Sequence, residues 1–339
     1  MWRSIAIAAA AALVWAPGGA GDGRDDTAFL QAKLDAGGTL NLPKLPNGEC
    51  YATRGLWVSR DDTTITSNGA CIVALGPGEV RLTSPDGDAI AANALFFVNH
   101  SAPLEPTPVR IAISGVKISV PAAAGMFGIA VYGHEVNVRG VTVSGSPVDA
   151  ITVGGRANGS GYAGRVAIVD STLSGAMRNV VSATGVISLR IERNRIFGTR
   201  DLPPGQPAAG IDVEPDHRGA PTLDVSIARN TIVDNAGPGI IVSLDSNRGL
   251  PVIASQVRID RNRVLRNGRK PTPPQLAGIV LNGGQDRGGA RLVLTNNVVR
   301  RNHGPGVLGS KLNVVVVARG NDLRGNSGGP SKGVRFAKR

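Results

Sequence analysis

A repeated pair of asparagines is the feature of this sequence that most restricts its fold. The pattern apolar-x-x-Asn-x-apolar-x-x-Asn starts at Ile227, Ile259 and Leu294, with weaker copies at Ile191 and around Asn326. A unit of this size cannot bury its own apolar residues, so the units are expected to stack as coils of a solenoid. Asn suits the inside of a turn, where its amide can bond the backbone and the Asn of the next coil. The alternative is that these residues only mark ordinary hairpin turns.

A second pattern, Gly-Ile-x-Val or a close variant, alternates with the first. It starts at Gly128, Ala150, Gly210, Gly239, Gly278 and Gly306. Its apolar residues alternate, as in a strand with one buried face. We therefore predict two short strands per unit, with coils stacked in parallel about 4.8 Å apart. The predicted inward positions are Ile129, Ile151, Val180, Ile211, Ile240, Ile279 and Val307.

Composition agrees with a turn-rich β protein. The chain has 46 glycines and 42% hydrophobic residues but only 18% charged residues. This hydrophobicity argues against disorder, the aperiodic glycines exclude collagen, and so much glycine disfavours a helical bundle. The net charge of +12 favours an acidic partner, which could be nucleic acid, anionic lipid or an acidic polysaccharide.

The N-terminal segment narrows that choice. A short positive start, the apolar stretch Ile5 to Trp15 and small residues up to Ala20 predict a signal peptide over residues 1–20. The stretch is too short for a membrane span, although an anchor that stays attached is the alternative. A secreted protein is not expected to bind nucleic acid, so an acidic polysaccharide becomes the favoured partner. Export also favours a disulfide between Cys50 and Cys71 over two free thiols.

A short helix is predicted before the repeats. Residues 27–35 follow two aspartates and end at Gly37, and their apolar residues Phe29, Leu30 and Leu34 would cover the end of the core. The segments Gly38-Thr39-Leu40-Asn41-Leu42-Pro43 and Gly48-Glu49-Cys50-Tyr51 follow.

This order of helix, strand segments and repeats resembles the right-handed parallel β-helix, or pectin-lyase-like, superfamily. The resemblance implies an all-β fold: a right-handed parallel β-helix solenoid with a short N-terminal capping helix. We expect this domain over residues 21–328, a basic C-terminal tail over 329–339, and a monomer. The superfamily includes pectate and alginate lyases, polygalacturonases, mannuronan epimerases and non-catalytic binding proteins, so the resemblance leaves the activity open.

One coil carries the predicted catalytic residues. Asp212 and Glu214 are two places apart on a strand and should point the same way, where two carboxylates can act as acid and base. Asp216 lies in the next outward position, and His217 could abstract a proton near neutral pH. The alternative is that these acids only solvate an exposed strand.

Several residues are predicted to bind the substrate. Arg156 or Arg218 could neutralise a uronate carboxylate, and Asn282 lies in the same outward column as Glu214. Arg229 and Arg261 form a stripe with Arg193 beside the Asn repeats, which would suit a regularly spaced polyanion or simply keep the surface soluble.

The residues thus favour a secreted lyase or C5-epimerase acting on an acidic (uronate) polysaccharide. Segment 213–217 faintly resembles the Asp-Pro-His-Asp signature of mannuronan epimerases, whereas the polygalacturonase and pectate lyase signatures are absent. A non-catalytic cell-surface or glycan-binding protein is the alternative, followed by a glycoside hydrolase using Asp212 and Glu214. No metal site or cofactor is predicted, although paired carboxylates are also able to hold calcium.

Overall fold

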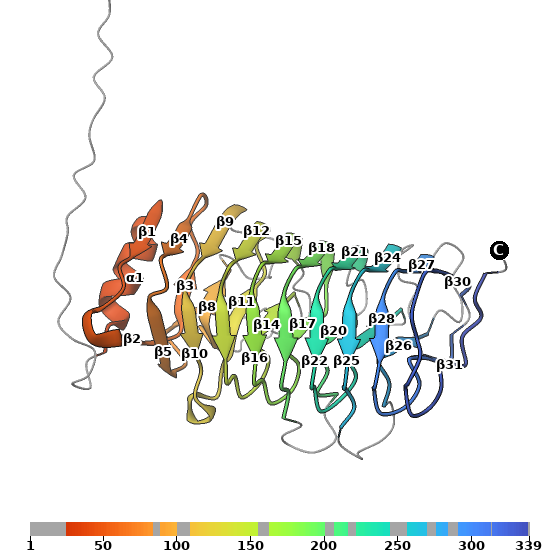
Figure 1. The fold of residues 1–339 in the computed structure, drawn as a ribbon. Helices are drawn as coiled ribbons and strands as arrows, with labels where there is room; N and C mark the ends of the chain where they lie inside the picture. Colours follow the sequence, from red (N-terminus) through yellow and green to blue (C-terminus); the bar gives the residue numbers. More distant parts are fainter. Residues whose placement is uncertain are drawn as a thin grey trace, which may run out of the picture.

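The computed structural model describes residues 25–83, 89–99, 109–154, 163–200, 207–215, 222–244, 256–269, 276–283, 291–312 and 314–337. Within these ranges the chain winds as successive coils along one axis, with the first helix at one end and the C-terminus at the other (Figure 1). Each complete coil contributes one strand to each of three parallel sheets, which we name A, B and C. Repetition along the axis therefore builds a parallel β-helix, as the sequence predicts.

Within each sheet, every strand is hydrogen-bonded to the strand of the next coil along the axis. Sheet A contains β1 (Thr39–Leu42), β4 (Thr64–Ser67), β9 (Val109–Ser114), β12 (His134–Arg139), β15 (Ala163–Val169), β18 (Val186–Glu192), β21 (Thr222–Ala228), β24 (Gln256–Asp260), β27 (Arg291–Thr295) and β30 (Val316–Arg319). Sheet B contains β2 (Cys50–Arg54), β5 (Cys71–Gly76), β10 (Lys117–Ser119), β13 (Thr142–Ser144), β16 (Thr172–Ser174), β19 (Arg195–Phe197), β22 (Thr231–Val233), β25 (Arg263–Leu265) and β28 (Val298–Arg300). Sheet C contains β3 (Leu56–Val58), β8 (Ala94–Val98), β11 (Phe127–Val131), β14 (Ile151–Val153), β17 (Val181–Ala183), β20 (Ile211–Val213), β23 (Ile240–Ser243), β26 (Ile279–Asn282), β29 (Val307–Ser310) and β31 (Ser331–Lys332).

A few short elements lie outside these sheets. The antiparallel pair β6 (Val80–Thr83) and β7 (Ala89–Ala91) and the single-turn 3₁₀ helices Pro46–Gly48 and Ala122–Ala124 interrupt the coils. β31 pairs with β29, so the last coil includes part of the segment expected to be a tail after residue 328. The predicted signal peptide lies outside the described residues.

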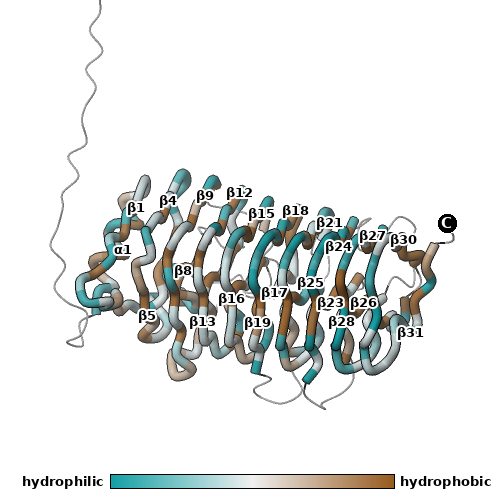
Figure 2. Tube along the Cα trace, viewed as in Figure 1, coloured by the Kyte–Doolittle hydropathy of each residue, from teal (hydrophilic) through white to brown (hydrophobic). Residues whose placement is uncertain are grey.

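Aliphatic side chains fill the interior because the same position faces inward in every coil. Ile191, Ile227 and Ile259 of sheet A are paired in register and fully buried, as are Ile196, Ile232 and Val264 of sheet B. Figure 2 shows hydrophobic segments recurring from coil to coil along the axis. One contiguous core therefore runs the length of the described solenoid.

The asparagines form ladders at the two turns that flank sheet B. Asn230 donates from Nδ2 to the carbonyl of Ile191 (2.8 Å) and to Oδ1 of Asn262 (3.0 Å), while its own Oδ1 accepts from the backbone of Asn194 (2.9 Å). The second ladder joins Asn235, Asn267, Asn302 and Asn326 in the same way. The predicted Asn ladder is confirmed.

The prediction of two strands per coil was wrong, because each complete coil has three. The Asn pattern does not correspond to a single strand, because it covers the end of a sheet A strand and a separate sheet B strand. At Arg229 the backbone takes a positive φ of 56°, and Asn230 follows, so the chain turns between β21 and β22. A corner of only two residues leaves almost no gap in the hydrophobic pattern, which hides the third strand.

The helix α1 (Thr27–Ala36) closes the N-terminal end, as predicted, and stops at Gly37 with a φ of 73°. Leu30 and Leu34 are buried on the core, whereas Phe29 is 38% exposed and does not cover it as expected. The disulfide between Cys50 and Cys71 is present and joins paired positions of β2 and β5. The first two coils are thus fastened to each other.

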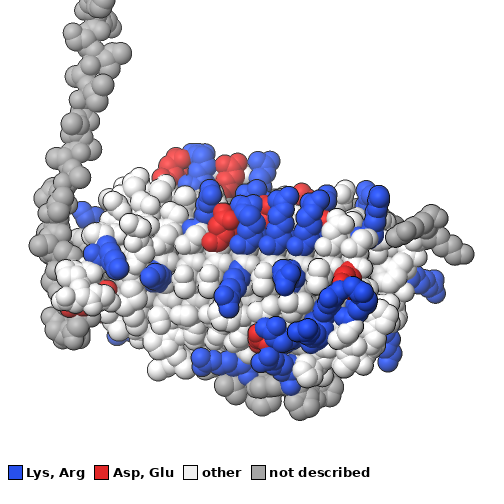
Figure 3. Space-filling model, viewed as in Figure 1, with Lys and Arg blue, Asp and Glu red and all other residues white. Residues whose placement is uncertain are grey.

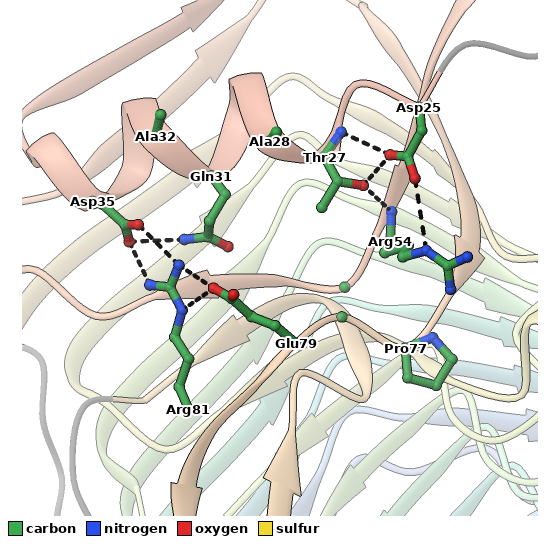
Figure 4. Close-up of a pocket in the computed structure, with 12 residues that line it drawn as sticks. Asp25, Thr27, Ala28, Gln31, Ala32, Asp35, Arg54, Pro77, Glu79 and Arg81 are labelled. Atoms are coloured by element: carbon green, nitrogen blue, oxygen red, sulfur yellow. Dashed lines mark hydrogen bonds and ion pairs between the residues drawn. The ribbon is translucent and has the colours of Figure 1, made fainter.

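Polar side chains fix α1 to the first coil (Figure 4). Gln31 accepts a bond from Trp57 N–H (2.8 Å) and donates one to the Trp57 carbonyl (3.0 Å), so its amide takes the place of a neighbouring strand for β3. Arg81 bridges Asp35 and Glu79 across a cavity of about 640 Å³ and holds the pKa of Asp35 below its usual value. The cap is therefore held by hydrogen bonds and ion pairs as well as by apolar contact.

Candidate active site

The predicted catalytic coil lies on the outward side of sheet C. β20 pairs with β17 on one side and β23 on the other, so Asp212 lies between Ser182 and Ile241. The registers also correct one predicted position: Val181, and not Val180, pairs with Ile211. Both valines are fully buried, and this coil has no glycine to mark the start of the strand, so the sequence pattern fits either choice.

Asp212 is buried instead of lying on an open strand face. Its exposed fraction is 4%, and its neighbours Ser182 and Ile241 are equally covered. Oδ2 accepts a hydrogen bond from Nδ2 of Asn179 (3.0 Å), while Oδ1 has no hydrogen-bond partner within the described part of the chain. A buried carboxyl oxygen without a partner is costly and points to a functional use.

Two further residues complete a polar cluster that the sequence did not predict. Asp149 is fully buried and receives both Nε (2.9 Å) and Nη2 of Arg178, together with the backbone N–H of Asn179 (3.0 Å). Oδ1 of Asn179 accepts from the backbone of Ala209 (2.9 Å), so the amide that bonds Asp212 is held at both ends. The position two residues before the sheet C strand holds Asp149, Asn179 and Ala209 in three successive coils. An alignment of the coils at that position would have revealed the polar side chains of Asp149 and Asn179.

Burial favours the neutral form of Asp212. Burial raises the pKa of Asp212 to about 8, and the negative charges of Glu214 and Asp149 contribute to this rise, against the lowering effects of Arg178 and Asn179. Because Oδ2 accepts the bond from Asn179, the proton of the neutral acid resides on Oδ1. The arrangement therefore leaves one buried carboxyl oxygen whose hydrogen-bonding capacity the described residues do not use.

The structure brings some of the other predicted residues to this face. Glu214 follows β20, is partly exposed, and continues the ladder through its N–H to the Ala183 carbonyl (3.0 Å). Asn282 occupies the matching position two coils further and bonds Ser243, the residue between them, through Nδ2 (3.2 Å). Asp216, His217, Arg218 and Arg156 lie outside the described residues.

Arg229 and Arg261 lie elsewhere, at the corner between sheets A and B. With Arg193 they form what we call the arginine row, one residue per successive coil, each with a positive φ. Arg229 pairs with Glu192 (2.8 Å) and Arg261 with Asp260 (3.0 Å), but both side chains remain 53% exposed. Figure 3 shows Lys and Arg following one another along this edge. The predicted stripe exists, at a corner of the solenoid and not on sheet C, where Asp212 lies.

Neither a metal site nor a membrane helix is found in the described ranges. No group of three or more His, Cys, Asp or Glu side chains gathers there, and no helix among those residues is long and apolar enough to span a bilayer.

Comparison with known proteins agrees with this architecture. Residues 127–333 match the family model described as a right handed beta helix region. The A-module of mannuronan C-5 epimerase AlgE4 from Azotobacter vinelandii is similar over 95% of this chain and 98% of its own, with a TM-score of 0.53 and 15% identity. Tailspike protein gp49 of Acinetobacter baumannii bacteriophage Fri1, a capsular polysaccharide depolymerase, is similar over 93% of this chain and 55% of its own, with a TM-score of 0.53 and 13% identity. No curated protein matches the sequence.

Proposed function

The chain belongs to the right-handed β-helix family, and on that premise we propose that it is a secreted enzyme acting on an acidic polysaccharide as a lyase or C5-epimerase. The observation that carries the proposal is the buried Asp212, whose Oδ1 has no hydrogen-bond partner among the described residues and whose burial raises its pKa, two residues from the partly exposed Glu214. Proton transfer at a sugar carbon needs one group that gives a proton and one that takes it, and two neighbouring carboxyl groups can share these roles.

Each residue of the cluster has a part in this reaction. Glu214 removes the C5 proton of a uronate residue, and Arg178, 36% exposed beside Asp149, supplies positive charge toward the uronate carboxylate. In the lyase reaction the C5–H electrons form the C4=C5 double bond while the C4–O bond breaks, and Asp212, which is 4% exposed, protonates the leaving oxygen once substrate binding has uncovered it. In the epimerase reaction Asp212 returns a proton to C5 from the opposite face. Asp216, His217, Arg218 and Arg156 remain predicted contributors.

The substrate class rests on charge and on proteins of the same fold. The chain is strongly basic, with 37 Lys and Arg against 25 Asp and Glu, which suits a polyanion. Two solved structures of this fold carry names that refer to polysaccharide reactions, one a mannuronan C-5 epimerase and the other a capsular polysaccharide depolymerase. Both names support a polysaccharide substrate, and mannuronan is an acidic one, whereas the sugar and linkage are left to experiment.

The test is a panel of pectate, alginate and glycosaminoglycans, each with and without calcium. Ultraviolet absorbance follows unsaturated uronate, a reducing-end assay follows chain cleavage, and proton NMR follows C5 inversion. Asp212→Asn and Glu214→Gln are expected to lower turnover by about 100-fold or more. Asp224→Asn, at a carboxylate on sheet A, is the matched control. Reducing ends without absorbance would replace the proposal with a hydrolase, and silence in all three assays would reject it for these substrates.

A non-catalytic glycan-binding role is the second candidate, and the arginine row favours it. Its guanidinium groups recur once per coil and remain about half exposed despite their ion pairs. Polysaccharide binding that is lost in Arg229→Ala and Arg261→Ala, together with silence in the turnover assays, would favour this role.

A further inference from the structure

A second basic surface lies on sheet B, toward the C-terminal end of the solenoid. A cavity of about 400 Å³ opens over the paired strands β25 and β28, and Arg263, Arg266, Arg300 and Arg301 line it. Figure 3 shows Lys and Arg gathering toward this end of the molecule. The cavity belongs neither to the Asp212 cluster, which is on sheet C, nor to the arginine row at the corner of sheets A and B.

The sequence builds this cavity from strand alternation. Val264 and Val299 point into the core, so the residues on either side of them point outward. The outward positions are Arg263 and Leu265 on one strand, and Val298 and Arg300 on the next. Leu265 and Val298 therefore give an apolar floor between guanidinium groups. An apolar floor with a charged rim matches a sugar ring, which has an apolar face and charged substituents at its edge.

Part of the positive charge at this site is not neutralised by any side chain that the structure describes. Arg266 is bound to Asp234 through Nε (2.9 Å) and Nη2 (2.6 Å). By contrast, Arg263 and Arg301 are exposed and make no ion pair with any residue that the structure describes. Nε of Arg300 is buried and lacks a hydrogen-bond partner in the same part of the chain. Arg263 and Arg301 thus have donor capacity left for an anionic ligand.

The protein's own Asp322 shows that this surface holds carboxylates. Asp322 receives Nε (3.0 Å) and Nη2 (3.1 Å) of Arg324 and a further bond from Arg300. These bonds hold the pKa of Asp322 well below its usual range. A second cavity of about 320 Å³, lined by Arg300, Arg301 and Arg324, continues the surface toward the next coil.

We propose that these arginines form an anion subsite that binds carboxylate or sulfate groups on different residues of an acidic polysaccharide. Arg263 is level with Val298, and Arg301 lies three positions further along the chain on that adjacent coil, so the two arginines stand on a diagonal, about 10 Å apart along the strand direction. At that separation they can contact acid groups on different sugars of one bound chain. The subsite shares its substrate class with the proposed function but requires no catalysis. It would retain the polymer on the enzyme or, in a binding protein, serve as a primary contact.

The test measures the dissociation constants of oligogalacturonate, oligomannuronate and a heparin oligosaccharide for the purified protein by calorimetry. The double variant R263A/R301A is expected to bind the preferred oligosaccharide about tenfold more weakly or worse. The variant R263K/R301K keeps the charge but loses the bidentate geometry of the guanidinium group. Its dissociation constant should lie between those of R263A/R301A and the unmodified protein. K33A/K44A, which removes two charges at the capping end, is the matched control and should bind normally. Circular dichroism checks that each variant is folded.

Three results would overturn the subsite: unchanged binding in R263A/R301A, equal weakening in K33A/K44A, or a stronger arginine-dependent affinity for phosphatidylserine vesicles, which would indicate a membrane surface. The Asp212→Asn protein, which should lose turnover but keep arginine-dependent binding, separates this inference from the proposed function. In the unmodified protein, arginine-dependent binding without turnover in any panel assay would reject the enzyme and support the subsite. Turnover with no such dependence would do the reverse.

Discussion

At the scale of single residues, surroundings decide what each charged group can do. Asp212 and Asp322 are both aspartates beside arginines, yet burial and neighbouring acids raise the pKa of Asp212, whereas direct bonds from Arg324 and Arg300 lower that of Asp322. Asp212 is suited to donating a proton, whereas Asp322 is suited only to binding the neighbouring arginines.

Asp212 should make folding stability depend on pH. Its pKa of about 8 in the folded protein exceeds the unfolded value of about 3.9, so the folded state keeps a proton that the unfolded state releases. The contribution of Asp212 to the free energy of unfolding is complete below about pH 4. As the pH rises toward 8 this contribution is lost, by at most about 1.4 kcal/mol per pH unit. Asp212→Asn should remove this loss, making the variant the more stable protein at pH 8. Urea unfolding at pH 5 and pH 8 measures the difference, and parallel pH profiles for the two proteins would contradict the assignment.

Arg229 allows binding and backbone strain to be separated. Its positive φ of 56° is unfavourable for a residue with a Cβ, and glycine takes the same position of the turn at Gly140 and Gly320. Arg229→Gly and Arg229→Ala both remove the guanidinium, but the glycine variant should be about 1 kcal/mol more stable. Thermal unfolding checks the stability, and polyuronate binding should weaken equally in both. Equal stabilities would mean that this φ carries no strain.

At the scale of elements, edges and turns need explicit hydrogen-bond partners. A β-helix pairs each strand with the next coil, which leaves its first strands without a neighbour on one side. Gln31 serves β3, and Asp26 serves β2 through its N–H to the Ala52 carbonyl (2.7 Å) and its Oδ2 to the Ala52 N–H (3.1 Å). At the corners, the amides of the Asn ladders likewise bond backbone N–H and carbonyl groups.

Asn262 should be important for stability. Replacement by Ala removes acceptors for Asn230 and a donor to the Ile227 carbonyl, and leaves those buried groups unpaired. We expect a loss of about 3 kcal/mol in the free energy of unfolding. Asn137→Ala on an exposed face of β12 is the control and should change stability by less than about 0.5 kcal/mol. Denaturant titration gives both values, and equal effects would remove the special role of the ladder.

Gln31→Ala should expose the edge of β3. The N–H and carbonyl of Trp57 would lose both partners, so a destabilisation of about 2 kcal/mol and increased self-association through the open edge are expected. Analytical ultracentrifugation and denaturant unfolding measure the two effects. Gln256→Ala, at an exposed position of β24, serves for comparison. A variant with the association state and stability of the unmodified protein would show that the Gln31 amide does not protect the edge of β3.

At the scale of the whole molecule, the sequence predicted what repeats and missed what is particular to one coil. Asn230, Asn262 and Asn297 recur in one pattern, and the ladder, the stacked core and the disulfide follow from such local signals. Asp149 and Arg178 meet across about 30 residues, and their pairing depends on the register of β14 with β17, which the hydrophobic pattern leaves uncertain by one residue. The burial of Asp212 likewise depends on what lies over sheet C, and periodicity carries no such information.

The solenoid should respond locally to loss of its disulfide. Each coil contacts only its neighbours, so a change at one end passes along the axis through successive interfaces and weakens with distance. The Cys50–Cys71 bond joins residues 21 positions apart, and its removal is expected to cost about 3 kcal/mol, concentrated in α1 and strands β1 to β5. In Cys50→Ser/Cys71→Ser, hydrogen exchange should accelerate in residues 25–76 while strands β21 to β28 keep their protection. Uniform acceleration along the chain would instead show that the coils unfold as one cooperative unit, and the effects of Gln31→Ala would then reach Asp212 as well.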